Sequence, residues 1–195
     1  MEDILGHFVD ISNGHDDYLK ISFMPSNKSI HDAWQKNGLS ADFIADYWDS
    51  FYSKRFNKLK KDYSKMRYGV CYIANELLEN AMKHHCQNIK IPITISVYLY
   101  PYELFFYVSN CILKKDSELF KTYIQKLLHE DPATLYLYHV ERSVSDDFLS
   151  KSCLGYVTLL NDYKTQLGWR FYSKSLQSDY VEVTVMVRLN INDNQ

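Results

Sequence analysis

The chain has 195 residues, of which 46% are hydrophobic and 24% are charged, as in a globular domain that builds its own core. The formal net charge of -2 at pH 7 gives no electrostatic basis for binding nucleic acid, which requires a basic surface. The four cysteines form no CxxC pair, so neither a zinc ribbon nor a thioredoxin motif is indicated.

The sequence also indicates the cellular compartment of the protein. The start, Met1-Glu2-Asp3, lacks the basic region and the long apolar run of a signal peptide, and scattered unpaired cysteines are typical of a reducing compartment. The most apolar stretch, residues 91–108, is broken by two prolines and rich in β-branched residues, which favours strands over a membrane helix. We therefore expect a cytoplasmic protein that contacts no membrane.

The first elements alternate between strand and helix patterns. Hydrophobic residues at every second position predict a strand from Tyr18 to Met24. A short helix is expected over residues 29–36, ended by Asn37-Gly38, and Ser40 is a good N-cap for the next helix. That helix has a strongly aromatic face, made of Phe43, Ile44, Tyr47, Trp48, Phe51 and Tyr52. It must therefore pack against a large apolar surface.

The middle of the chain predicts a long helix and a hairpin. Residues 66–84 have helical periodicity, and their inward stripe is Val70, Ile73, Leu77 and Ala81. Two strands follow over residues 91–100 and 104–108, joined by a turn at Pro101-Tyr102-Glu103.

Three helices and two strands complete the chain. Ser117 is predicted to cap the first helix, and Asp131 with Pro132 at the first helical position opens a second helix that ends near Arg142. The inside of the first helix is expected to hold Leu119, Phe120, Ile124, Leu127 and Leu128. The remaining elements are a polar loop over 143–152, a helix over 155–164, and strands over 168–173 and 180–189.

Hairpin strands with helices inserted between them predict an α/β (α+β) fold. We expect a two-layer sandwich in which a mixed β-sheet carries helices on one face. One domain should cover residues 1–195, with flexible ends at 1–17 and 190–195. The chain also has 17 tyrosines. These indicate either an interface-forming surface or strand and helix positions that lie partly in the core.

The segment with the clearest chemistry is Asn75 to His84, which contains Glu76 and Asn80. Residues four apart lie on one face of a helix, and this face borders the apolar stripe. A carboxylate there can act as a base or orient a water, and an amide oxygen can bind Mg²⁺. The alternative is a glutamate and an asparagine on a solvated helix flank.

Several segments carry a resemblance to one superfamily. Glu76 to His84 (ELLENAMKH) resembles the N box of the GHKL superfamily, the histidine-kinase-type ATPases. Residues 37–45, 72–81, 154–163 and 167–169 resemble a branch of it, the SiaB-like proteins and the related cyanobacterial GHKL-type regulators. The resemblance covers residues 18 to 189. It implies a Bergerat-like ATPase fold and a role in signal transduction.

The resemblance also implies roles for single residues. Glu76 takes the place of the catalytic acid, and Asn80 takes the place of the Mg²⁺ ligand. Lys83 or His84 stands where a basic residue often approaches the phosphates of ATP. Three further positions correspond to nucleotide contacts, the purine contacts Asn110 and Thr184 and the phosphate-side glycine Gly155.

Two departures from the superfamily pattern weaken the nucleotide site. Asn110 replaces an aspartate that reads the adenine amine, so it offers an acceptor without charge. Cys153 stands where the branch prefers glycine, and cysteine is less compatible with a backbone of positive φ. The alternative for Thr184, and the more common role of such a residue, is that of an ordinary strand threonine.

Two functional hypotheses follow. In the first, the protein is a bacterial signalling regulator that binds ATP and Mg²⁺ and acts as a serine/threonine kinase on a small regulatory phosphoprotein in a partner-switching circuit. In the second, it is a degenerate, nucleotide-free GHKL module that regulates other proteins by binding them. We expect no nucleic-acid partner, and a homodimer because many members of the superfamily form one.

Overall fold

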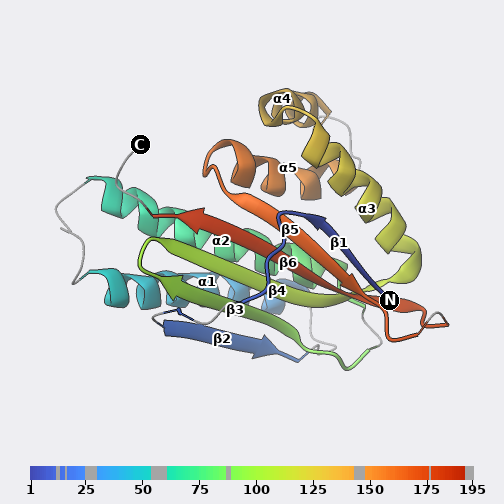
Figure 1. The fold of residues 1–195 in the computed structure, drawn as a ribbon, viewed down its shortest axis with the longest axis horizontal. Coiled ribbons are helices and arrows are strands. Elements are labelled where there is room, and N and C mark those ends of the chain that lie inside the picture. The colour runs from blue at the N-terminus through green and yellow to red at the C-terminus, as the bar shows by residue number, and fades with distance from the viewer. Residues whose placement is uncertain are drawn as a thin grey trace.

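A computed structural model gives the fold of the chain (Figure 1). The structure describes residues 1–191 except 12–13, 16, 25–29, 54–60, 87–88, 143–147 and 176; for residues 30–36, 61–62, 138–142 and 148–153 it describes the backbone alone. The strands are β1 (Glu2–Gly6), β2 (Asp17–Phe23), β3 (Ile93–Tyr100), β4 (Glu103–Leu113), β5 (Gln166–Tyr172) and β6 (Tyr180–Asn190). The helices are α1 (Ile30–Tyr52), α2 (Lys61–His84), α3 (Lys114–His129), α4 (Pro132–Arg142) and α5 (Phe148–Asn161).

The six strands form one sheet in the order β1-β5-β6-β4-β3-β2. Every neighbouring pair is antiparallel, so the predicted mixed sheet is corrected to an antiparallel one. The reason is visible between β2 and β3, where α1 and α2 are inserted as a pair. Two antiparallel helices return the chain to the end of the sheet that it left, whereas a single crossover helix would have made the strands parallel.

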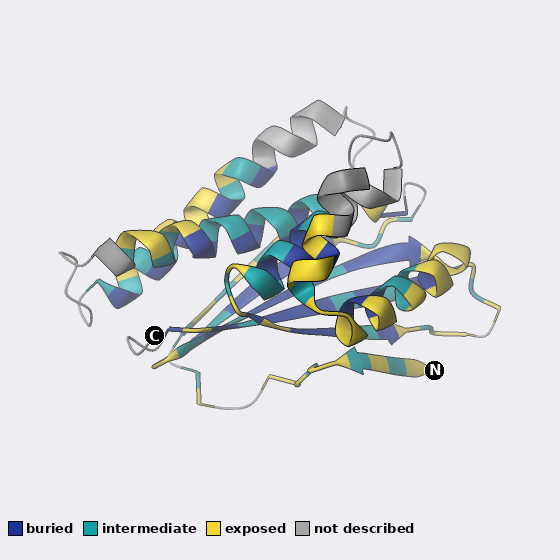
Figure 2. Cartoon of the chain, turned by 90° about the horizontal axis from the view of Figure 1, so that it is seen from above, coloured by how far each residue is buried: buried dark blue, intermediate teal, exposed yellow. Residues whose placement is uncertain are grey.

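The helices cover one face of the sheet, here called the inner face, and α1 and α2 lie side by side on it (Figures 1 and 2). On β6 this face carries the four buried valines Val181, Val183, Val185 and Val187. The opposite, outer face carries the residues between them, of which Glu182 and Thr184 are half-buried and Met186 is buried. The predicted α+β fold class with helices on one face is therefore confirmed.

Several helix boundaries differ from the prediction. Helix α1 runs without a break through Asn37-Gly38, because one glycine costs only about 1 kcal/mol in a helix that packing stabilises. Helix α3 starts at Lys114, so Ser117 lies inside it and donates a hydrogen bond to the Lys114 carbonyl at 2.7 Å. This start turns Leu119 outward, and it is 64% exposed.

One further expected core leucine and the extent of the expected loop also need correction. Leu128 is 37% exposed, whereas Ile124 and Leu127 are buried as predicted. Helix α5 begins at Phe148, within the region expected to be a loop; residues 143–147 lie outside the described residues.

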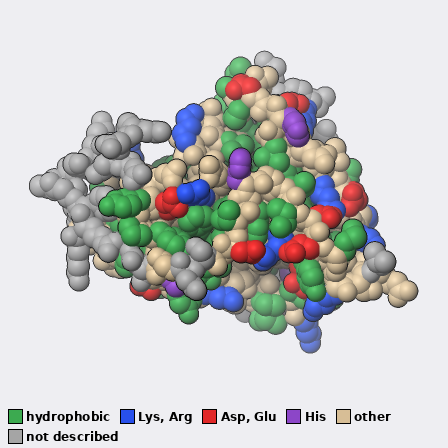
Figure 3. Space-filling model, viewed as in Figure 1, with side chains coloured by type: hydrophobic (Ala, Val, Ile, Leu, Met, Phe, Trp, Pro, Cys, Tyr) green, Lys and Arg blue, Asp and Glu red, His purple; other side chains and the backbone are tan. Residues whose placement is uncertain are grey.

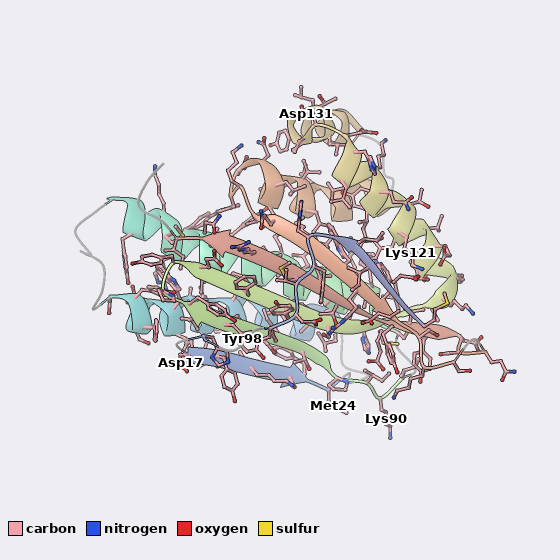
Figure 4. All side chains as sticks on the ribbon, viewed as in Figure 1. Asp17, Met24, Lys90, Tyr98, Lys121 and Asp131 are labelled. Atoms are coloured by element: carbon pink, nitrogen blue, oxygen red, sulfur yellow. The ribbon has the colours of Figure 1, made fainter. Side chains whose placement is uncertain are left out.

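Strand β1 was not predicted, since residues 1–17 were expected to be a flexible end. Glu2–Gly6 pairs with β5, and Lys121 of α3 donates to Asp3 at 2.7 Å (Figure 4). Five residues with only two half-buried positions give too little hydrophobic alternation to reveal an edge strand. Among the described helices, none combines the length and apolarity needed to cross a membrane.

Candidate functional site on helix α2

Helix α2 presents Glu76 and Asn80 to helix α5, not to open solvent. A Cβ placed on Gly155 of α5 would lie 2.3 Å from Oε2 of Glu76 and 3.8 Å from Nδ2 of Asn80. The two side chains therefore share one face of α2, as their spacing predicted. Since that face meets the backbone of α5, the alternative of a solvated helix flank does not apply.

The carboxyl group of Glu76 sits in a partly apolar environment. Burial, followed by the nearby Glu79 carboxylate, raises the pKa of Glu76 above its ordinary value of 4.5, and a hydrogen bond from Tyr72 opposes the shift. Burial raises the pKa of Tyr72 to about 12, so its hydroxyl remains a donor. The Tyr72 ring stacks on Tyr163 at 5.2 Å. The acid is thus held in place by an aromatic pair that sequence reasoning missed.

Asn80 has an amide nitrogen that is buried and has no hydrogen-bond partner among the described residues. The oxygen and nitrogen of an amide can be exchanged by a flip, which would direct Oδ1 to the same place. An oxygen there fits Mg²⁺, which takes few protein ligands and relies on phosphates and waters for the others. In the described part of the chain, no three His, Cys, Asp or Glu residues lie close enough together to hold a metal ion by themselves.

Gly155 does not form the phosphate cradle that the resemblance implied. It lies inside helix α5, and the described glycines with positive φ are Gly6 and Gly14. Its physical role is to allow close approach: with no Cβ, the α5 backbone can contact the Glu76 carboxylate. Cys153 also lies within helix α5, where no glycine-rich loop is formed. The residues present therefore fit the metal in part and do not fit a glycine-rich phosphate loop.

The two purine contacts do not converge on this site. Asn110 is buried on the inner face, where its amide nitrogen donates to the Ala81 carbonyl at 3.1 Å. Thr184 lies on the outer face of the sheet, because successive side chains of a strand alternate, and it hydrogen-bonds Ser109 at 2.9 Å. The expected pairing of Asn110 with Thr184 around one base is therefore corrected.

Lys83 and His84 follow Asn80 by three and four residues, so they continue its edge of the helix. Both lie in the last turn of α2 and are exposed. Partial desolvation of the ring, followed by the Lys83 charge, lowers the pKa of His84, and Asp116 opposes the shift. This end of the helix therefore carries a lysine charge and a histidine biased towards its neutral form.

The fold places the chain in a recognisable structural class, an antiparallel open sheet with helices on one face. A chain in the crystal structure of the SiaB-SiaC complex from Pseudomonas aeruginosa shares this fold with a TM-score of 0.57, over 87% of this chain and 89% of that chain. The two sequences are 11% identical, so the similarity establishes the fold alone. No protein-family model matches the sequence, and no curated protein matches it.

Proposed function

We propose that this protein is a signalling regulator that acts by binding a partner protein, and that its Glu76–Asn80 site takes no nucleotide. The observation that carries the proposal is the packing of Gly155 against the Glu76 carboxylate. An acid enclosed between two helices and held by Tyr72 is poorly placed to activate a group on an external substrate.

The remaining nucleotide positions support the same interpretation. The amide of Asn110 is used inside the protein, and Thr184 is on the far side of the sheet. The fold neighbour belongs to a complex of two proteins. The resemblance to SiaB-like proteins implies a small regulatory phosphoprotein as the partner, and a homodimer stays a prediction.

A second candidate, an ATP- and Mg²⁺-dependent protein kinase, is favoured by one observation. The buried amide of Asn80 has no partner in the described residues and lies beside a carboxyl group whose pKa is raised. These are the features expected of a metal ligand next to a general base.

Calorimetric titration with a non-hydrolysable ATP analogue and Mg²⁺ separates the two candidates. We expect no heat of binding and no thermal shift at millimolar nucleotide. Binding that is lost in Asn80→Ala and retained in Asn75→Ala, a matched change five residues earlier on α2, would replace the proposal with the kinase. Partner binding is tested separately, by measuring the affinity of the purified protein for a recombinant small phosphoprotein of the class that the resemblance implies.

A further inference from the structure

The segment after β1, residues 7–11, crosses the outer face of the sheet; it is called the strap below. In Figure 1 this blue segment passes in front of the strands. Gly6 turns the chain into the strap with a φ of 70°, a conformation that glycine adopts without strain. A Cβ on Gly168 would lie 2.3 Å from the Phe8 nitrogen and 2.4 Å from its Cα. The strap backbone therefore contacts the sheet directly at Gly168.

Three residues of the sheet hold the strap, and together they are called the strap platform: Tyr107, Gly168 and Arg170. The Tyr107 hydroxyl donates to the Val9 carbonyl at 2.8 Å. The Arg170 guanidinium pairs with Asp10 at 2.7 Å and lies 4.8 Å from the centre of the Phe8 ring.

The contacts that the platform makes are those of a binding site for an extended peptide. Phe8 and Asp10 are two residues apart, so in an extended chain they project to the same side. One arginine engages both of them, the ring through a cation–π contact and the carboxylate through an ion pair. The hydroxyl of Tyr107 donates a hydrogen bond to the backbone carbonyl of Val9, the residue between them. The strap therefore matches the platform as a ligand matches its site.

The strap is also weakly held. Within the described residues, one backbone hydrogen bond, from the His7 amide to the Leu167 carbonyl at 2.8 Å, joins it to the sheet backbone. Val9 and Ile11 are each 44% exposed, and the Asp10 side chain is 78% exposed in its ion pair. Exposed ion pairs contribute about 0–1 kcal/mol. The strap is therefore a surface segment whose contacts with the sheet are few and partly exposed.

The surface around the strap platform suits a protein partner. Tyr98 projects from the outer face beside it (Figure 4), and its ring stacks on Tyr18 at 5.6 Å. His15 contacts the Tyr98 ring at 5.2 Å. On the face shown in Figure 3, hydrophobic side chains lie between basic and acidic ones. Tyrosine and arginine are the residues that interfaces enrich.

We propose that the strap is an internal ligand, and that an extended segment of a partner protein replaces it on the strap platform. The partner segment has an aromatic residue and a carboxylate two positions apart, as Phe8 and Asp10 are. This inference rests on the proposed partner binding for the existence of a partner, and it names the partner's chemistry and the way access is controlled. A strap donated by a second copy of the chain is the other occupant that the test below detects.

The test uses the full chain and a fluorescent peptide of residues 5–13. In the double variant Phe8→Ala/Asp10→Asn the internal strap loses its contacts with Arg170. We therefore expect the peptide to bind this variant at least tenfold more tightly than it binds the unmodified chain. Adding Arg170→Gln to this variant should weaken peptide binding tenfold or more. In Gly168→Ala the new Cβ should exclude the internal strap and the peptide alike, so the peptide should not bind.

Two outcomes of the affinity measurements overturn the proposal. One is equal peptide affinity for the unmodified chain and the double variant; the other is unchanged binding after Arg170→Gln. A measurement on the unmodified chain does not depend on any variant folding. Excess peptide should accelerate hydrogen exchange in residues 7–11, and peptide binding without this acceleration contradicts displacement.

Mass measurement by light scattering identifies the other occupant. The unmodified chain and Phe8→Ala/Asp10→Asn should have the same mass, whether both are monomers or both are dimers. A dimeric unmodified chain and a monomeric variant would show that two copies exchange straps, and would overturn the partner segment. Failure of all peptide binding overturns the strap proposal alone, because the nucleotide titration and the partner affinity in the preceding subsection do not involve the strap platform.

Discussion

The two faces of the sheet differ in how their side chains are packed, and two neighbouring residues of strand β4 show the difference. Phe106 is fully buried on the inner face. Phe105, its neighbour on the outer face, is half-buried, with Tyr100 at 5.3 Å and the Arg188 guanidinium at 5.5 Å from its ring. The inner face is a packed hydrocarbon core, whereas the outer face combines rings with charges. The inner face therefore supplies the core that stabilises the fold, and the outer face leaves rings and charges partly exposed.

The same comparison explains the candidate site. Glu76 and Asn80 belong to the inner layer, where polar groups are enclosed by helices, while Tyr107 and Arg170 belong to the outer layer under an exposed strap. The outer contacts involve a strap whose Val9, Asp10 and Ile11 are exposed. The inner residues Glu76 and Asn80 lie against the backbone of α5 at Gly155.

The largest effect expected is loss of stability from truncating the inner face. Phe106→Ala should lower the free energy of unfolding by about 3–5 kcal/mol, because it removes a fully buried ring and leaves a cavity. Phe105→Ala, the matched change on the outer face, should cost about 1 kcal/mol. Urea denaturation measures both values, and similar losses for the two variants would refute the assignment of the faces.

A second prediction sharpens the account of Gly155. Gly155→Ala should lower the free energy of unfolding by no more than about 1 kcal/mol, since its Cβ would displace the flexible end of the Glu76 side chain while alanine itself favours the helix. Gly38→Ala is the control, because no atom lies within 4 Å of its added Cβ, and it should stabilise helix α1 by about 0.5–1 kcal/mol. Combining Gly155→Ala with Glu76→Ala should recover part of the loss. A purely additive double variant would show that the two residues do not touch.

A third prediction concerns the pH dependence of stability. Because the pKa of Glu76 is raised in the folded state, the folded protein binds more protons than the unfolded chain between pH 4.5 and the raised value. Stability should therefore fall as the pH rises through this window. Glu76→Gln should remove that fall and be at least as stable as the unmodified protein at pH 7. The exposed control Glu118→Gln should keep the fall, and an identical pH profile for Glu76→Gln would contradict the burial of the acid.

The smallest effect expected is that of the outer ion pair. Asp10→Asn should lower the free energy of unfolding by less than about 1 kcal/mol, because both side chains of the pair with Arg170 are partly exposed. The difference from the unmodified protein should shrink further in 1 M salt. A loss as large as that of Phe106→Ala would mean that the strap is part of the core, not a displaceable cover.

Much of the fold was predictable because its signals are local. The alternation in β2 and β6, the inward stripe of α2 and the hairpin at Pro101 were read from a few neighbouring residues and are confirmed. The start of α4 follows from Asp131, whose carboxylate accepts the Thr134 amide at 2.9 Å. Strand β1 and the unbroken course of α1 were missed, because each depends on a partner distant in sequence.

The sequence by itself determined the fold class and the pairing of Glu76 with Asn80 on one helix face, since both follow from periodicities of two and 3.6 residues. Only the tertiary structure decided what that face meets. It placed Gly155 against the acid, Thr184 on the opposite face and the strap over Gly168. These contacts depend on strand register and on the close approach of distant backbones, and no run of neighbouring residues records either.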